Sequence, residues 1–234
     1  MDPDEREQQV ASLLAQWPAD LSGVLIGGFA VAAYGRARYS EDVDILASSN
    51  YRSEWVRWLE TNGLLRKRSH TVARQGGRPV EVQVWHHMAV SLDLMTGGLR
   101  DRESGVVIPE PWILRDSHSV QLELLSGRVD TPVNVVRLEG LWAMKVIAGR
   151  PQDLTDLFGI RAQPVNLSEV RELFSALMTP RLRGKLESIL SRTLEHKSFA
   201  DALSRLRLGS PELRENRSAW DNFVRMIEGT IPPD

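Results

Sequence analysis

The chain contains no cysteine among its 234 residues, which excludes a disulfide framework and a thiolate zinc site. It also lacks a long apolar run, because the longest, residues 24–34, contains two glycines and is shorter than the about 20 residues that span a membrane. The opening MDPDEREQQ is acidic and polar, unlike a secretory signal. We therefore expect a cytoplasmic protein with no membrane partner.

A strong net charge is also absent, since 29 basic residues nearly balance 31 acidic ones. This balance excludes a global attraction to nucleic acid. One local exception lies between Glu60 and Glu81, where five cations and no acidic residue occur: Arg66, Lys67, Arg68, Arg74 and Arg78. A solvated hairpin is the ordinary meaning of such a run, and a nucleic-acid contact is the alternative.

The hydrophobic pattern changes character part-way along the chain. Alternation and short buried runs predict strands in six segments: 23–28, 42–47, 80–86, 90–96, 120–125 and 133–138. Helical spacing predicts helices in eight segments: 4–17, 29–35, 52–62, 138–148, 153–159, 167–177, 181–206 and 217–228. We expect Gly35 to end the second of these in a left-handed cap. Two prolines interrupt 98–118, which we expect to be a loop with an edge strand, and 126–132 is expected to be a turn.

Strands therefore dominate the front of the chain and helices the back. This order predicts an α+β fold with a helical C-terminal part. We expect two domains, a catalytic-type core over 1–137 and a helical domain over 138–234.

Two carboxylates share one face of a predicted strand in DVDILA. Asp42 and Asp44 are two residues apart, so they project to the same side of the strand. Their repulsion is relieved by a divalent cation, and hard oxygen ligands favour Mg²⁺ or Mn²⁺.

Two adjacent glycines precede this strand in GGFAVAAYGRARYSEDVDIL. Gly27 and Gly28 stand where a predicted strand passes into a helix, and without Cβ atoms their N–H groups can approach an anion closely. A glycine pair alone is usually a turn, and Asp-x-Asp alone is usually a solvated strand end. In this order they predict a phosphate cradle opposite a metal site, which suits chemistry on a nucleoside triphosphate.

This block resembles the DNA polymerase β-type nucleotidyltransferases, and more narrowly the AbiEii-like toxins of bacterial toxin–antitoxin pairs. The matching positions are Gly27, Gly28, Ala30, Tyr34, Gly35, Arg38, Ser40, Asp42 and Asp44. The resemblance implies a small mixed sheet with flanking helices. It further implies metal-dependent transfer of NMP from an NTP to a hydroxyl acceptor such as tRNA or another RNA, and a cognate antitoxin. Gly27, Gly28, Arg38 and Ser40 are then nucleotide-binding residues.

The superfamily also uses a third carboxylate on a neighbouring strand, as metal ligand and as base or orienter of the acceptor hydroxyl. Asp93 in VSLDLMT is the better candidate, and Glu81 on the preceding strand competes with it. An ordinary edge-strand carboxylate is the structural alternative for Asp93.

A second matching segment is LEGLWAMKVIAGRPQDLTDL. The resemblance implies that Lys145 pairs with the triphosphate as part of the catalytic set, and that Asp153 orients it or a nearby arginine. The structural alternative is a snorkelling lysine followed by aspartates that favour a helix N-terminus. Arg36 and Arg38 can equally steer the triphosphate or form salt bridges with Glu41 and Asp42.

Two other functions compete with the RNA-modifying toxin. One is a small-molecule nucleotidyltransferase that modifies an antibiotic, which predicts an acidic acceptor pocket. The other is a catalytically silent nucleotide-binding module that acts through a partner protein. The intact pair Asp42 and Asp44 argues against the silent module.

Overall fold

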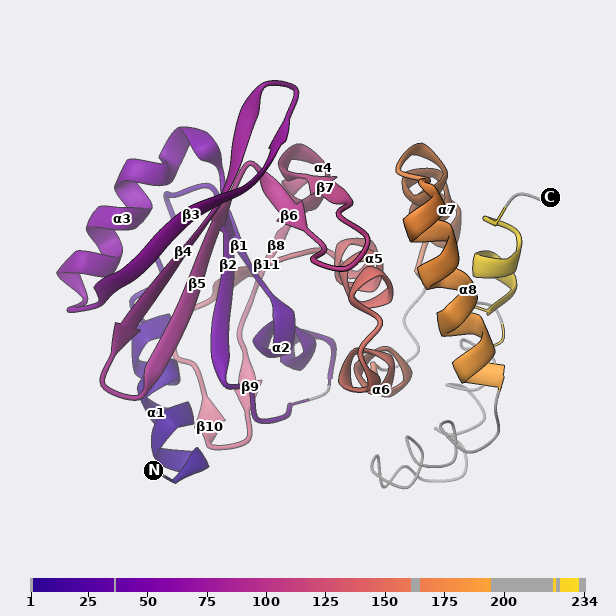
Figure 1. The fold of residues 1–234 in the computed structure, drawn as a ribbon. Coiled ribbons are helices and arrows are strands. Elements are labelled where there is room, and N and C mark those ends of the chain that lie inside the picture. The colour runs from indigo at the N-terminus through magenta and orange to yellow at the C-terminus, as the bar shows by residue number, and fades with distance from the viewer. Residues whose placement is uncertain (1, 36, 161–164, 195–220, 222–223, 232–234) are drawn as a thin grey trace. The chain divides into compact units, whose positions relative to one another are not determined.

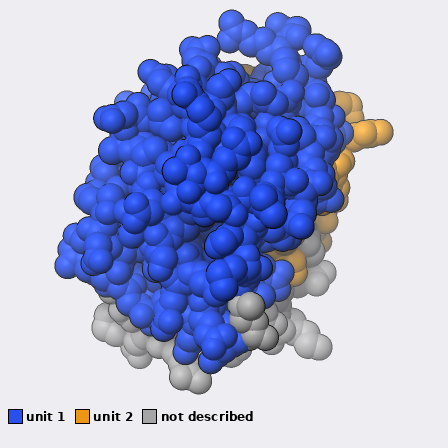
Figure 2. Space-filling model, turned by 90° about the vertical axis from the view of Figure 1, so that its left-hand side faces the viewer, with its two compact units in different colours: residues 1–100, 107–137 blue, residues 101–106, 138–234 orange. Residues whose placement is uncertain are grey.

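The structure is a computed structural model that describes residues 2–35, 37–160, 165–194, 221 and 224–231. The chain divides into two compact units, coloured separately in Figure 2. The first comprises residues 1–100 and 107–137, and the second comprises 101–106 and 138–234. Within the described residues, no helix is long and apolar enough to cross a membrane.

A seven-stranded mixed sheet forms the first unit, in the order β3-β4-β5-β2-β1-β11-β8 (Figure 1). Two pairs, β2 with β5 and β1 with β11, are parallel, and the other neighbours are antiparallel. The strands are β1 (Gly23–Ile26), β2 (Asp42–Ala47), β3 (Leu65–Gln75), β4 (Arg78–His87), β5 (Val90–Thr96), β8 (His118–Val120) and β11 (Val133–Val135).

Short helices and two small hairpins surround this sheet. The helical segments are α1 (Pro3–Leu14), α2 (Gly27–Ala30), η1 (Val31–Tyr34), η2 (Ser49–Tyr51), α3 (Arg52–Thr61) and α4 (Glu110–Leu114). The hairpins pair β6 (Gly98–Arg100) with β7 (Val107–Pro109), and β9 (Glu123–Leu124) with β10 (Gly127–Arg128).

Helix α3 covers one face of the sheet through a buried tryptophan. The ring of Trp55 fills the space beside Gly23 of β1, where an added Cβ would lie 2.6 Å from a ring carbon. Trp17 and Trp58 meet Trp55 edge to face, at centroid distances of 5.2 and 5.4 Å. Burial of these large rings fixes α3 on the sheet, and Gly23 is required for the close approach.

The segment between β1 and β2 is held by a cap and one buried hydrogen bond. Gly35 ends η1 in the left-handed conformation, with φ of 86°. The hydroxyl of Tyr34 donates to the carbonyl of Val136, just after β11, at 2.6 Å. These two features turn the chain back toward Asp42 at the start of β2.

The second unit is helical over most of its described residues. Its helices are α5 (Leu138–Ala148), α6 (Pro151–Gly159), α7 (Leu167–Ala176) and α8 (Pro180–Leu194), and residues 224–228 are also helical. Nearly every residue of α5 is buried, as expected for a helix that is apolar on all sides.

Most predicted elements are confirmed. The predicted strands at 42–47, 80–86 and 90–96, the left-handed Gly35 and the helices that begin the second unit are all present. The segment 66–78 is indeed a hairpin, formed by β3 and the start of β4. Residues 195–206 and 217–220, predicted to be helical, lie outside the described part of the chain.

Several of the predicted boundaries were wrong. The opening helix ends at Leu14 instead of residue 17. Segment 98–118 holds the β6–β7 hairpin and α4, because Pro111 lies in the first turn of α4, where no N–H is needed. Segment 120–125 is not one strand, since the chain leaves the sheet after β8 and forms the β9–β10 hairpin over the expected turn. The predicted strand 133–138 is shortened to β11, and α5 begins at Leu138.

Asp101 in the second unit supplies a prediction about pH. Burial raises the pKa of its carboxyl, but hydrogen bonds from Ser104 and from Lys185 at 3.0 Å lower the pKa by more than burial raises it. The pKa therefore lies below its ordinary value of 3.8. A lowered folded-state pKa stabilises the fold above the unfolded-state pKa, and this contribution is lost as pH falls through the folded-state pKa. We expect Asp101→Asn to lower the free energy of unfolding at pH 7 by roughly 0.5–1.5 kcal/mol, because solvent screens a partly exposed ion pair.

The difference between the variant and the wild type should shrink below about pH 4. Urea titrations of both proteins from pH 3 to pH 7 measure it. A difference that stays constant over this range would contradict the assigned stabilisation.

Candidate active site

The strand register brings two carboxylates side by side. Asp44 of β2 pairs directly with Asp93 of β5 in the parallel ladder, so both side chains project from the same face of the sheet. Asp42 lies two residues before Asp44 on that face and pairs with Ser91. Asp42 is exposed, whereas Asp44 and Asp93 are partly buried. All three predicted carboxylates therefore share one face, called here the carboxylate face.

Glu81 lies on the opposite face. It pairs with Thr96, whereas Asp93 pairs with Val84, and both offsets are three residues, an odd number that reverses the face. Its carboxylate forms an ion pair with Arg52 of α3, and the Nε atom of Arg52 lies 2.8 Å from Oε2 of Glu81. The register thus separates the two candidates that the sequence left open, with Asp93 beside Asp44 and Glu81 beneath α3.

The two glycines leave space that neighbouring side chains occupy. Gly27 has φ of +70°, and a Cβ added to it would lie 2.0 Å from the Oδ2 atom of Asp44. A Cβ added to Gly28 would lie 2.2 Å from Oγ of Ser40 and 3.1 Å from a guanidinium nitrogen of Arg38. The structure therefore brings Gly27, Gly28, Arg38, Ser40 and Asp44 into one cluster.

Hydrogen bonds hold the loop that carries Arg38 and Ser40. The Nη1 atom of Arg38 donates to the carbonyl of Tyr39 at 2.9 Å, and Oγ of Ser40 donates to the carbonyl of Asp42 at 3.4 Å. Arg36 lies outside the described residues.

The donor set of this cluster fits a hard divalent cation. Carboxylate oxygens are the ligands that Mg²⁺ prefers, and this ion is commonly held by one or two carboxylates together with substrate phosphates. No group of three acidic or histidine side chains among the described residues forms a ready cage for a metal. Two adjacent carboxylates beside a glycine cradle instead match a site in which one or two carboxylates bind the ion and substrate phosphates complete its coordination.

Lys145 and Asp153 form a second cluster, within the helical unit. The Nζ atom of Lys145 lies 3.0 Å from Oδ1 of Asp153 and 2.8 Å from Oδ2 of Asp156, and all three side chains are buried. Arg150 also binds Asp153, at 2.6 Å. Asp156 was not among the predicted site residues, although its spacing of three residues from Asp153 already puts both on one side of α6.

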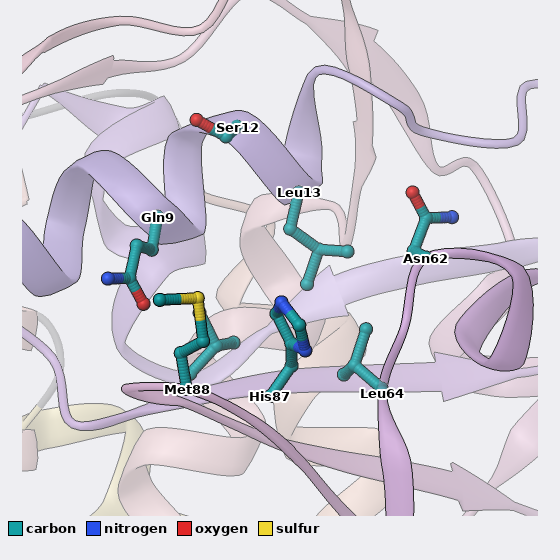
Figure 3. Close-up of a pocket in the computed structure, with 8 residues that line it drawn as sticks. Gln9, Ser12, Leu13, Asn62, Leu64, His87 and Met88 are labelled. Carbon is teal, nitrogen blue, oxygen red and sulfur yellow. The ribbon is translucent and has the colours of Figure 1, made fainter.

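A pocket of about 280 Å³ lies elsewhere in the first unit (Figure 3). It is formed by α1, the chain after α3 and the turn between β4 and β5, and it contains no acidic residue. Its lining residues are Gln9, Ser12, Leu13, Asn62, Leu64, His87, Met88 and Val90. It is therefore not the acidic acceptor pocket that an antibiotic-modifying enzyme predicts.

A protein-family model matches residues 12–234, and its description is "Nucleotidyl transferase AbiEii toxin, Type IV TA system". The chain belongs to this family. The AbiEii resemblance drawn from the glycine pair and Asp-x-Asp is thus confirmed, and the protein is a nucleotidyltransferase of the toxin–antitoxin class. No curated protein matches it in sequence.

Solved structures with low sequence identity are similar over most of the chain. JHP933 from Helicobacter pylori is 14% identical, with a TM-score of 0.39, and the match covers 97% of this chain and 90% of that one. The antibiotic-resistance factor ANT(2″)-Ia is 14% identical, with a TM-score of 0.38 and coverage of 98% and 97%. TM1012 from Thermotoga maritima is 13% identical, with a TM-score of 0.42 and coverage of 66% and 91%.

The contact between Gly27 and Asp44 supplies the second prediction. We expect Gly27→Ala to reduce nucleotidyl transfer at least about 100-fold, because the methyl group displaces the Asp44 carboxylate and strains a left-handed residue. Initial rates of transfer and a thermal melt of the same sample measure it.

Gly76→Ala is the matched control, since Gly76 also has positive φ, at +55°, but has open space around its Cβ position. It should lose a similar amount of stability through backbone strain and keep its activity. Equal activities of the two variants would contradict a special role for the space beside Asp44.

Proposed function

We propose that this AbiEii-family protein transfers NMP from an NTP to a hydroxyl group of RNA, such as the end of a tRNA, with Mg²⁺ or Mn²⁺ bound by Asp42, Asp44 and Asp93. The observation that carries the proposal is the direct pairing of Asp44 with Asp93, beside Gly27, where an added Cβ would lie 2.0 Å from the Asp44 carboxylate. The family supports the reaction class, and the RNA acceptor and the metal are our inference.

The chain's own groups would bind the triphosphate at the glycine pair. Backbone N–H groups at the start of α2 have no side-chain cap and are available to phosphate oxygens. The guanidinium of Arg38 and the hydroxyl of Ser40 lie against Gly28, so they can add charge and a hydrogen bond to the same phosphates. The divalent ion would neutralise phosphate charge and polarise the α-phosphorus when bound.

Asp93 would orient the acceptor. In the proposed step, the acceptor oxygen forms a bond to the α-phosphorus, the bond from that phosphorus to the bridging oxygen breaks, and pyrophosphate leaves. The hydroxyl proton passes to a carboxylate oxygen of Asp93. The position of Asp93 one strand away from Asp44 supports this division, since one carboxylate then faces the triphosphate and the other the acceptor.

For Lys145 and Asp153 we propose the supporting part that the family resemblance implies, with Lys145 in contact with the triphosphate and Asp153 as its orienter. An ammonium group has three protons, and Asp153 and Asp156 engage two of them, so one remains for a phosphate oxygen. Both aspartates would fix the direction of that third donor.

The family description also supports a cognate antitoxin as a partner. We propose that such a partner exists and that it protects the cell from the modification of RNA. The substrates of the proposed reaction, NTP and RNA, are consistent with the cytoplasmic location expected from the sequence.

The third prediction compares substitutions of two carboxylates, Asp93 and Glu81, that lie on opposite faces of the sheet. Asp93→Asn should reduce labelling of total RNA by a labelled NTP at least about 100-fold, because the acceptor loses its proton acceptor. Glu81→Gln, on the opposite face, should stay within a few-fold of the wild type. EDTA should abolish labelling, and added Mg²⁺ or Mn²⁺ should restore it.

The same incubation includes aminoglycosides and protein as other acceptors. Labelling of an aminoglycoside instead of RNA would show that the acceptor is an antibiotic and that the proposed RNA acceptor is wrong. Asp93→Asn that labels RNA as well as the wild type would overturn the proposed catalytic role.

A further inference from the structure

The edge strand β3 carries most of the basic run noted in the sequence. Its residues from Leu65 to Thr71 are all exposed, and residues 61–80 contain no acidic side chain. Lysines, arginines and bulges commonly protect an edge strand from pairing with other chains. The charge alone therefore identifies no ligand, and the directions of the side chains decide the matter.

A β-bulge at Lys67 turns two arginines to opposite faces of the sheet. Arg66 pairs with Trp85 and Arg68 with Val84, so Lys67 is an extra residue on β3. In a regular strand Arg66 and Arg68 would share a face. The bulge reverses the alternation between them.

The contacts of Arg66 agree with this assignment. Its guanidinium lies over the ring of Trp85, 5.8 Å from the centroid. Trp85 is four residues after Glu81 along β4, an even spacing, so it shares the face that α3 covers. Arg66 therefore lies on the α3 side, and Arg68 lies on the carboxylate face.

Arg68 also belongs to the cross-strand row that contains the two central carboxylates. It pairs with Val84, Val84 pairs with Asp93, and Asp93 pairs with Asp44. Arg68 is two strands from Asp93, which corresponds to about 10 Å at the usual spacing of strands. The cation Arg68 thus lies in the same row as the two carboxylates, two strand spacings from Asp93.

Two further polar residues lie on the same face. His70 pairs with Val82 in the adjacent row, and Arg78 lies at the start of β4 in the same alternation as Val82 and Val84. Val82 and His86, between the edge and β5, keep part of their surface exposed. Val84, directly between Asp93 and Arg68, is buried. The surface that leads from the carboxylates to the edge is therefore exposed at Val82 and His86, on either side of that residue.

The other arginines of the run have structural contacts. Arg74 donates to the carbonyl of Gly77 in the turn, at 3.2 Å, and Arg66 is stacked on Trp85. By contrast, Arg68 and Arg78 form no ion pair with any carboxylate among the residues that the structure describes. Their charge is available to a ligand.

We propose that the acceptor RNA strand crosses the carboxylate face from Asp93 to the edge strand, with its phosphates bound by Arg68, His70 and Arg78. This inference rests on the proposed transfer to RNA. A substrate with one reactive end and a repeating negative charge fits a row of cations that leads away from the reacting carboxylates. An acidic protein partner would need no alignment with that row.

The test compares Arg68→Gln with Arg66→Gln, two equal substitutions on one strand that alter opposite faces. Arg68→Gln should raise KM for RNA about tenfold and leave kcat and KM for the NTP unchanged, whereas Arg66→Gln should change KM for RNA less than twofold. The plot of log kcat/KM against log salt should become shallower by about 0.7 for Arg68→Gln, the value for one single-strand phosphate contact.

Binding of fluorescent single-stranded RNA to the same two variants, made in an Asp93→Asn background, separates this inference from the proposed function. If Arg68→Gln alone weakens binding but the wild type modifies no RNA, the surface stands and the proposed reaction fails. If RNA is modified and both variants bind it equally, the reaction stands and this surface is wrong. Loss of poly-glutamate binding alone in Arg68→Gln would indicate a protein-docking surface and would also overturn the inference.

Discussion

The parallel pairing of β2 with β5 is the constraint on which the site depends. It puts Asp44 next to Asp93, and like charges directly opposite each other destabilise a sheet. The fold accepts this repulsion and gives the Asp44 carboxylate the space that a side chain at Gly27 would fill. A bound cation would remove the repulsion, so the arrangement is most stable when the site is in use.

The same pairing dictates where the basic hairpin lies. Parallel neighbours need a crossover connection, and between β2 and β5 the chain forms α3 and the β3–β4 hairpin. Since β2 already pairs with β1 on its other side, the hairpin can continue the sheet from β5 only on the side away from β2. The topology puts the hairpin at the β5 edge, and the bulge at Lys67 then puts Arg68 on the carboxylate face.

Local features of this fold could be predicted from the sequence, and pairings could not. The left-handed Gly35 and the shared face of Asp42 and Asp44 follow from glycine sterics and strand alternation. The choice between Asp93 and Glu81 depends on the register of β4 against β5, which no local pattern encodes. The bulge at Lys67 is equally hidden, because it arises from the pairing of β3 with β4.

The helical unit shows how a residue can have both a structural and a functional part. Lys145 and Arg150 carry two positive charges, and Asp153 and Asp156 carry two negative ones, so this cluster is balanced without a nucleotide. A buried lysine that lost both carboxylates would be strongly destabilising. The two carboxylates also fix the direction of the ammonium group, so the same contacts stabilise the fold and orient its third proton. The structural role of Lys145 therefore does not compete with the role that its family resemblance implies.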